Sequence, residues 1–77
     1  MAKENKEFSY EVVKKFGTIG QSGSTTKELR LISWNGGEPK YDIRGWYTDD
    51  KGVEKANKGL TLTEAELRKL VELAADI

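Results

Sequence analysis

The sequence predicts one α+β domain, in which a small antiparallel sheet of about four strands is followed by a single C-terminal helix. Three segments alternate between apolar and polar residues and are enriched in β-branched and aromatic side chains, as strands are: residues 8–16, 29–34 and 40–48. Short runs of Gly, Asn, Asp and Ser separate these segments. Helical spacing of apolar residues begins only after residue 62, so the helix follows the strands.

The composition limits both the core and the chemistry. The chain has 77 residues and contains neither Cys nor His. A domain this small buries only about 60% of the surface that its unfolded chain exposes, and association of two copies is a common way to stabilise it. Without His and Cys the chain lacks the usual general base, the best nucleophile and the commonest metal ligands. We therefore expect a dimer that is not an enzyme and that uses no cofactor, metal or small-molecule substrate.

The formal net charge is zero, but the charges are unevenly distributed along the chain. Residues 12–47 carry six cations and three anions, whereas residues 61–77 carry two cations and four anions. A basic strand region is suited to contacts with phosphate, although ordinary solubilising charge would explain the asymmetry equally well. No apolar run approaches the roughly 20 residues of a membrane span, and the N-terminus lacks the apolar stretch of a signal peptide. We expect a protein of the cytoplasm or nucleoid.

The first strand is expected to follow a flexible arm, residues 1–7, and to open a domain that spans residues 8–77. Its alternation places Tyr10 and Phe16 on one face, and it is expected to reach Ile19. The segment Gly17-Thr-Ile-Gly20 matches the loop with which KH domains grip nucleotides, but its flanks have the character of strands. These glycines are therefore interpreted as a bulge or turn, and residues 21–26 as a flexible loop.

The central strand, residues 40–48, follows a predicted hairpin at Asn35-Gly36-Gly37, because Asn and Gly tolerate the positive φ angles of tight turns. Its alternation gives it two faces. Tyr41, Ile43, Gly45 and Tyr47 share one face, and Lys40, Asp42, Arg44, Trp46 and Thr48 share the other. A turn is predicted at residues 49–52, and residues 53–58 form either a short edge strand or an extended segment.

The C-terminal helix has the best-defined signals. Thr63 and Glu66 fit a capping box, in which each side chain accepts a hydrogen bond from the backbone amide of the other residue. The apolar residues that follow span an arc of about 160°, which one small sheet would not fully cover. A second helix from a twin subunit would cover it, although the helix could instead wrap over its own sheet. The predicted dimer interface consists of Leu67, Leu70, Val71, Leu73, Ala74 and Ile77.

Aromatic and basic residues lie close together on the predicted strands. Such a surface suits single-stranded nucleic acid, because bases stack on the rings for about 1–3 kcal/mol each while cations contact phosphates. The rings can also form core, since large aromatics dominate small cores, and for Trp34 both roles are equally supported. Trp46 is the better surface candidate because it shares its face with Arg44, unless a bulge near Gly45 shifts the register. Lys55 and Lys58 either hold phosphates or belong to a solvated loop.

Three stretches carry a family resemblance: Lys40-Tyr-Asp-Ile-Arg-Gly-Trp-Tyr47, the turn at residues 49–52, and Lys58-Gly-Leu-Thr-Leu-Thr63 before the terminal helix. They resemble the positive cofactor four family of transcriptional coactivators, and most closely its small bacterial, YdbC-type branch. The resemblance extends over residues 27–73. It implies a homodimer of curved antiparallel sheets, joined largely through the C-terminal helices, that binds single-stranded or unwound DNA with little sequence preference.

The resemblance also implies roles for individual residues. By position, Arg44 matches a basic residue of the family's DNA surface, and Trp46 or Tyr47 matches its stacking aromatic. Trp34 lies near the other stacking aromatic if a one-residue gap is allowed. Lys55 and Lys58 match lysines that precede the helix. The hairpin at residues 35–38 lacks the lysines of the eukaryotic members, so that part of the phosphate contact is not expected here.

Together, the residues and the resemblance predict a homodimer that binds single-stranded DNA, with RNA as a further ligand class, in transcription or in DNA repair and recombination. The alternative is a protein–protein interaction module, in which the helix and the exposed aromatics contact another protein. The predicted nucleic-acid contacts are Lys27, Arg30, Trp34, Lys40, Arg44, Trp46, Tyr47, Lys55 and Lys58.

Overall fold

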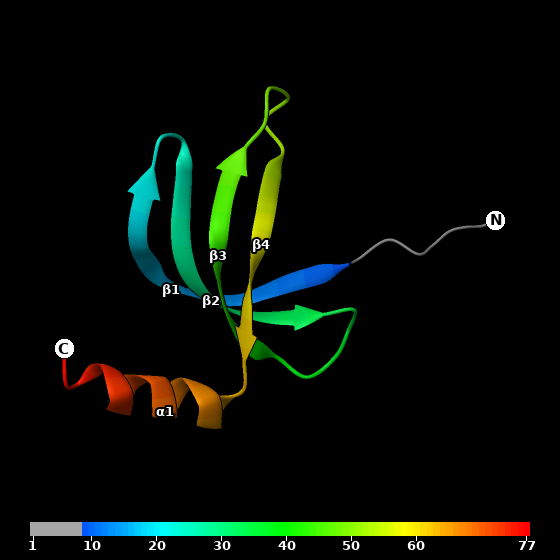
Figure 1. The fold of residues 1–77 in the computed structure, drawn as a ribbon. Helices are drawn as coiled ribbons and strands as arrows, with labels where there is room; N and C mark the ends of the chain where they lie inside the picture. Colours follow the sequence, from blue (N-terminus) through cyan, green and yellow to red (C-terminus); the bar gives the residue numbers. More distant parts are fainter. Residues whose placement is uncertain (1–8) are drawn as a thin grey trace.

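A computed structural model describes residues 9–77 and confirms the predicted α+β class, with four antiparallel strands in the order β1-β2-β3-β4 and one terminal helix (Figure 1). The predicted arm, residues 1–7, lies outside the described residues. The central strand β3 has the bounds that the alternation predicted. The elements are β1 (Tyr10–Ser22), β2 (Thr25–Trp34), β3 (Lys40–Thr48), β4 (Glu54–Leu62) and α1 (Glu64–Ala74).

The connection between β1 and β2 is shorter, and strand β4 is longer, than the sequence suggested. The predicted loop at residues 21–26 is wrong, because Ser22 pairs with Thr25 and the chain reverses through a two-residue turn. Gly23 makes this turn possible by adopting a φ of 59°, which side chains disfavour. The β-branched residues that follow it join β2 rather than a loop. Residues 53–58 were predicted to form either a short edge strand or an extended segment. The structure has a strand there, and this strand, β4, continues to Leu62.

Strand β1 does not keep a single alternation. Its register against β2 shifts three times, between Val12 and Lys14, Lys15 and Gly17, and Thr18 and Gly20. Of the two alternatives for the segment Gly17–Gly20, a bulge or a turn, the bulge is confirmed, although the inserted residues are Phe16 and Ile19, each next to a glycine. The prediction that Tyr10 and Phe16 share a face is wrong. The bulge between Val12 and Lys14 lies between these two residues, and a bulge reverses the side on which the following residues point. The ring centroids of Phe16 and Tyr41 are 5.8 Å apart, on the opposite face of the sheet from Tyr10.

The bulges accompany a strong curvature of the sheet. The ring of Tyr10 lies 5.3 Å from Trp34, its neighbour on β2, and 5.8 Å from Trp46. Trp46 pairs with Thr26, eight residues from Trp34 along β2, which would be about 26 Å in a flat strand. Tyr10 can contact both rings only because the sheet coils over itself. Figure 1 shows the first half of β1 crossing at a steep angle to the upright ends of the strands.

The concave face of the coiled sheet holds a core of rings and paired charges. Trp46 is 2% exposed and Ile32 is fully buried. The guanidinium of Arg30 lies over the Trp46 ring, with 3.8 Å between its Cζ and the ring centroid. Arg30 donates hydrogen bonds to the carboxylates of Glu28 (2.8 Å) and Glu54 (3.0 Å). Two carboxylates thus balance a buried cation, which would otherwise be costly to remove from water.

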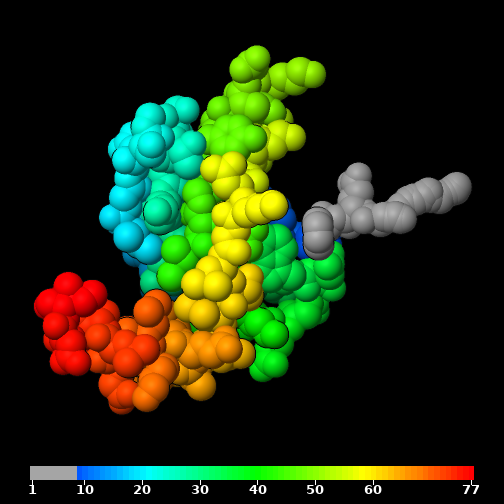
Figure 2. Space-filling view, in the orientation of Figure 1, coloured from blue at the N-terminus to red at the C-terminus, as the bar shows by residue number. Residues whose placement is uncertain are grey.

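The helix α1 begins with the predicted capping box. Thr63 accepts a hydrogen bond from the amide of Glu66 (3.1 Å), and Glu66 accepts one from the amide of Thr63 (2.9 Å). The helix meets the convex face, where Leu67 is half-buried, but its other predicted interface residues are exposed within the described chain. Figure 2 shows the helix standing out from the body of the sheet. In the described part of the chain, no helix has the length and apolar character needed to span a membrane.

The core makes a prediction about acid stability. Burial raises the pKa of Glu28, but hydrogen bonds from Thr26 and Arg30 and the charges of Arg30 and Lys15 outweigh it and hold the pKa below its ordinary value of 4.5. A carboxylate with a lowered folded-state pKa stabilises the fold above its unfolded-state pKa, and this contribution is lost as the pH falls through the folded-state pKa. Glu28→Gln should therefore lower the free energy of unfolding at neutral pH by about 3 kcal/mol, with a smaller deficit below about pH 4.

Urea unfolding at several pH values measures this difference. The matched control is Glu72→Gln, which removes an exposed carboxylate paired with Lys69 on the helix surface and should change the stability by less than about 0.5 kcal/mol. Asp49 also has a lowered pKa, because it accepts hydrogen bonds from the backbone amides of Val53 and Lys51. It is present in both variants, so its contribution to the acid dependence cancels in the comparison. A constant deficit for Glu28→Gln across the acid range would contradict the linkage.

Candidate nucleic-acid interface

A groove opens where the concave face reaches the edge strand β4. It has a volume of about 530 Å³. Its walls come from three distant parts of the chain, the start of β1, the end of β2 and the β3–β4 pair, which the curvature of the sheet brings together. The lining residues are Tyr10, Trp34, Arg44, Ala56, Asn57, Lys58 and Thr61.

Arg44 and Trp34 form a layered platform in this groove. The guanidinium lies over the indole, with 4.8 Å between Cζ and the ring centroid. Two hydrogen bonds to Asp42 hold the guanidinium in place, and its Nη1 also donates to the carbonyl of Asn57 (3.3 Å). Asp42 is fully buried and accepts a further hydrogen bond from Thr61 (3.1 Å). The charge of Arg44 is therefore balanced inside the protein, and its main contribution to the groove is a flat, oriented surface.

Gly59 leaves room for the Arg44 side chain. The two residues are partners in the β3–β4 register. A Cβ added at Gly59 would lie 2.6 Å from the carbonyl oxygen of Ile43 and closer still to the Cβ of Arg44. Real Cβ atoms do not approach backbone oxygens so closely, so a side chain here would force the two strands apart or displace Arg44. Glycine is thus required for steric reasons.

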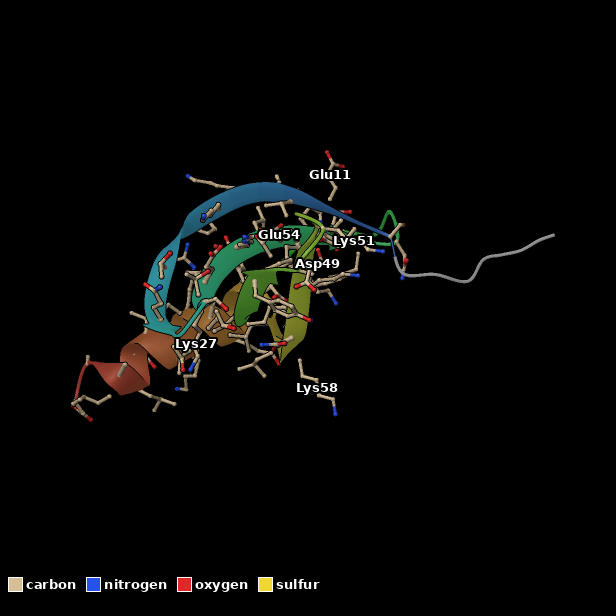
Figure 3. The ribbon with its side chains drawn as sticks, turned by 90° about the horizontal axis from the view of Figure 1, so that it is seen from above. Glu11, Lys27, Asp49, Lys51, Glu54 and Lys58 are labelled. Atoms are coloured by element: carbon tan, nitrogen blue, oxygen red, sulfur yellow. The ribbon has the colours of Figure 1, made fainter. Side chains whose placement is uncertain are left out.

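A bulge in β4 directs Lys58 outward. Between the pairs Arg44–Gly59 and Trp46–Ala56, β3 has one residue and β4 has two, Asn57 and Lys58. The extra residue belongs to β4, so β3 keeps its alternation and Trp46 and Tyr47 point to opposite faces. Figure 3 shows Lys58 extending away from the ribbon, on the opposite side from Glu11.

Two predicted contact residues are not on the surface. Trp46 was expected to be exposed beside Arg44, and this prediction is wrong, because Tyr10 and Arg30 cover its ring. The alternation identified the correct face, but that face is the concave one. Arg30 is only 4% exposed and is held by Glu28 and Glu54, so it does not meet solvent as a phosphate contact would.

The remaining predicted residues lie in different places. Trp34, Arg44 and Lys58 meet in the groove. Tyr47 is half-buried and pairs with Lys55 on the other face, where Lys55 lies 3.9 Å from the carboxylate of Asp49. The exposed residues Lys27 and Lys40 do not line the groove.

Within residues 9–77, no group of three or more acidic side chains is placed to hold a metal ion.

Four groove residues were not among the predicted contacts: Tyr10, Ala56, Asn57 and Thr61. Tyr10 is held against Trp34 by two hydrogen bonds between its neighbour Ser9 and Asn35. The backbone amide of Ser9 donates to Oδ1 of Asn35 (3.0 Å), and the backbone amide of Asn35 donates to the carbonyl of Ser9 (2.7 Å). Asn35 adopts a φ of 52° at the hairpin that the sequence predicted. Pairing this hairpin with the start of the first strand would have placed Tyr10 beside Trp34. No pattern in β4 marked the bulge that positions Asn57.

Two comparisons with known proteins bear on this site. Residues 22–73 match the sequence profile of the family described as Transcriptional Coactivator p15 (PC4). The match includes β2, β3, β4 and nearly all of α1. An uncharacterized protein of Treponema pallidum (strain Nichols) is 47% identical over 70 residues, which cover 90% of this chain and 79% of the relative.

The role of Gly59 can be tested directly. Gly59→Ala should displace Arg44 from Trp34 and lower the free energy of unfolding by about 1–3 kcal/mol, because the added methyl group has no space. Gly20→Ala is the matched control, since a Cβ there meets nothing within 4 Å. Urea unfolding and the tryptophan bands of the near-ultraviolet circular dichroism spectrum measure the two effects. Native stability and an unchanged spectrum for Gly59→Ala would contradict the packing described above.

Proposed function

The chain belongs to the transcriptional coactivator p15 (PC4) family, and from this premise we propose that it binds single-stranded DNA in the groove beside Trp34 without reading the base sequence. The family membership agrees with the resemblance carried by residues 40–63. The observation that supports the proposal most strongly is the arrangement of Trp34, Arg44 and Tyr10 around one groove at the sheet edge. The proposed role of this binding is in transcription or in DNA repair and recombination.

Stacking supplies most of the proposed binding energy. Aromatic rings and guanidinium planes both support stacked bases, and such contacts accept every base because each has a π-face. Trp34 is half-buried, so it keeps a fixed orientation while part of it remains accessible. Arg44 extends this surface and is pre-oriented by Asp42. A duplex would not bind in this way, because its bases are already stacked on one another.

Lysines supply the phosphate contacts. The charges of Arg30 and Arg44 are balanced by buried carboxylates, so these residues add little net attraction. Lys58 lines the groove, and the exposed residues Lys27 and Lys40 add positive charge outside it, whereas Lys55 is partly neutralised by Asp49. Because the chain has no net charge and the charges of Arg30 and Arg44 are neutralised internally, binding should depend only moderately on salt.

We further propose that the protein is a homodimer that associates through α1. Leu70, Val71 and Leu73 are 42%, 64% and 62% exposed, a large apolar surface for one short helix. An apolar cleft of about 370 Å³ lies between the helix and the convex face, lined partly by Phe16, Leu67 and Val71. The apolar helix face of a second copy has the chemistry to cover both surfaces, and a 77-residue chain without disulfides gains stability from that burial.

The binding proposal is tested with Trp34. Trp34→Ala should weaken the binding of a labelled thymidine oligomer of about 12 nucleotides by roughly 1–3 kcal/mol, measured by fluorescence anisotropy, because a stacking surface is lost. A base stacked on Trp34 should also quench the tryptophan emission of the wild type. Trp34→Phe is the matched control: it keeps a ring and should bind nearly normally, but its emission should not be quenched, since the remaining Trp46 is buried. Equal binding of the wild type to duplex and single strand would argue against stacking. No binding to either would favour the protein-interaction alternative.

The dimer proposal is tested with Val71. Val71→Asp should shift the protein toward monomer in sedimentation-equilibrium experiments, because a carboxylate would be buried against the partner helix. Val71 is 64% exposed within one chain, so the change should not disturb the fold of the monomer itself. Lys69→Asp, on the charged side of the same helix, is the control and should leave the association unchanged. A wild-type protein that sediments as a monomer at all concentrations would refute the proposal.

A further inference from the structure

A second hollow lies on the convex side of the sheet, around the end of the β1–β2 hairpin. It has a volume of about 430 Å³. Its polar lining includes Gln21, Ser22, Thr25, Lys27, Asn57 and Lys58. Gly45 lies in its lining and leaves no room for a side chain: a Cβ there would lie 2.8 Å from a methyl group of Thr25 and 3.1 Å from the side-chain amide nitrogen of Asn57.

The charges around this hollow favour an anion. Neither Lys27 nor Lys58 forms an ion pair in the part of the chain that the structure describes. No carboxylate lines the hollow. Glu28, beside Lys27 on β2, points to the concave side, where it accepts a hydrogen bond from Arg30, and Asp42 on β3 likewise binds Arg44. Hydroxyl and amide groups stand beside the two lysines. Two unpaired cations and several hydrogen-bond donors suit a phosphate group.

The hollow and the groove share two lining residues at the edge of the sheet. Asn57 and Lys58, the two residues of the β4 bulge, line both. Their other walls are on opposite faces, since Lys27 alternates with Glu28 on β2 and Gly45 alternates with Arg44 on β3. In Figure 3, Lys27 and Lys58 lie on the same side of the ribbon, away from Glu11. The bulge thus lies between the two sites and contributes residues to both.

We propose that the hollow between Lys27 and Lys58 is a phosphate-binding subsite, and that a single strand held in the groove crosses β4 at the bulge to reach it. This inference rests on the proposed binding of single-stranded DNA in the groove. A single strand can bend round an edge strand, whereas a duplex is stiff over about 150 base pairs. The path therefore selects unpaired strands by their flexibility, in addition to the selection made by stacking.

The subsite is tested with oligomers of two lengths. A thymidine oligomer of about 4 nucleotides should fill the groove alone, whereas one of about 12 nucleotides should also reach the hollow. Lys27→Ala should weaken the binding of the longer oligomer by about fivefold near 0.1 M salt and reduce its log–log salt slope by about 0.7, while the shorter oligomer binds as to the wild type. Lys51→Ala, at the β3–β4 turn, is the matched control with the same loss of charge.

A gain-of-function variant makes the test independent of any loss of folding. Gly20 lines the hollow and has open space beside it, so Gly20→Lys should tighten the binding of the longer oligomer only and steepen its salt slope by about 0.7. Equal effects of Lys27→Ala on both oligomers, or an effect no larger than that of Lys51→Ala, would overturn the subsite. Failure of the wild type to bind either oligomer would instead refute the proposed function of the groove.

Discussion

The stack of Arg30 on Trp46 is the interaction on which the rest of the fold depends. A four-stranded sheet of this length has too few apolar side chains to fill a deep core, and only Ile32 and Trp46 are buried hydrophobic residues within the described chain. The sheet instead coils so strongly that the ring of Tyr10 packs against the ring of Trp46. The guanidinium of Arg30 lies over the same Trp46 ring. Glu28 and Glu54 make this possible, because they neutralise a cation that would otherwise have to remain in water.

The same device is repeated nearer the surface with a different outcome. Arg44 lies on Trp34 as Arg30 lies on Trp46, and Asp42 neutralises Arg44 as Glu28 neutralises Arg30. The second pair, however, lies at the open edge of the coil, beside β4, where the sheet can cover it no further. Coiling therefore places one ring–guanidinium pair in the core and leaves the other as the wall of a groove. The structural and the proposed functional aromatics differ in their position along the curve rather than in their chemistry.

This difference explains what the sequence could predict and what it could not. Alternation located β3, and the Thr63–Glu66 box located the start of α1, because both signals are local. Alternation also assigned Trp46 to the face of Arg44, but it cannot tell a concave face from a convex one. Concavity arises from the bulges of β1 and from the packing of Tyr10, which join residues far apart in the chain. The burial of Trp46 and the groove role of Tyr10 were therefore beyond local patterns.

The β4 bulge connects the fold to the proposed nucleic-acid path. An edge strand has unpaired backbone groups on its outer side and is normally protected by charge or irregularity. Here the irregularity is Asn57-Lys58, which brings a lysine to the edge, while Gly59 next to it admits Arg44 to the groove. A regular β4 would turn Lys58 toward one face only and would separate the groove from the Lys27 hollow. One inserted residue thus protects the edge and places a cation where it can serve both faces of the sheet.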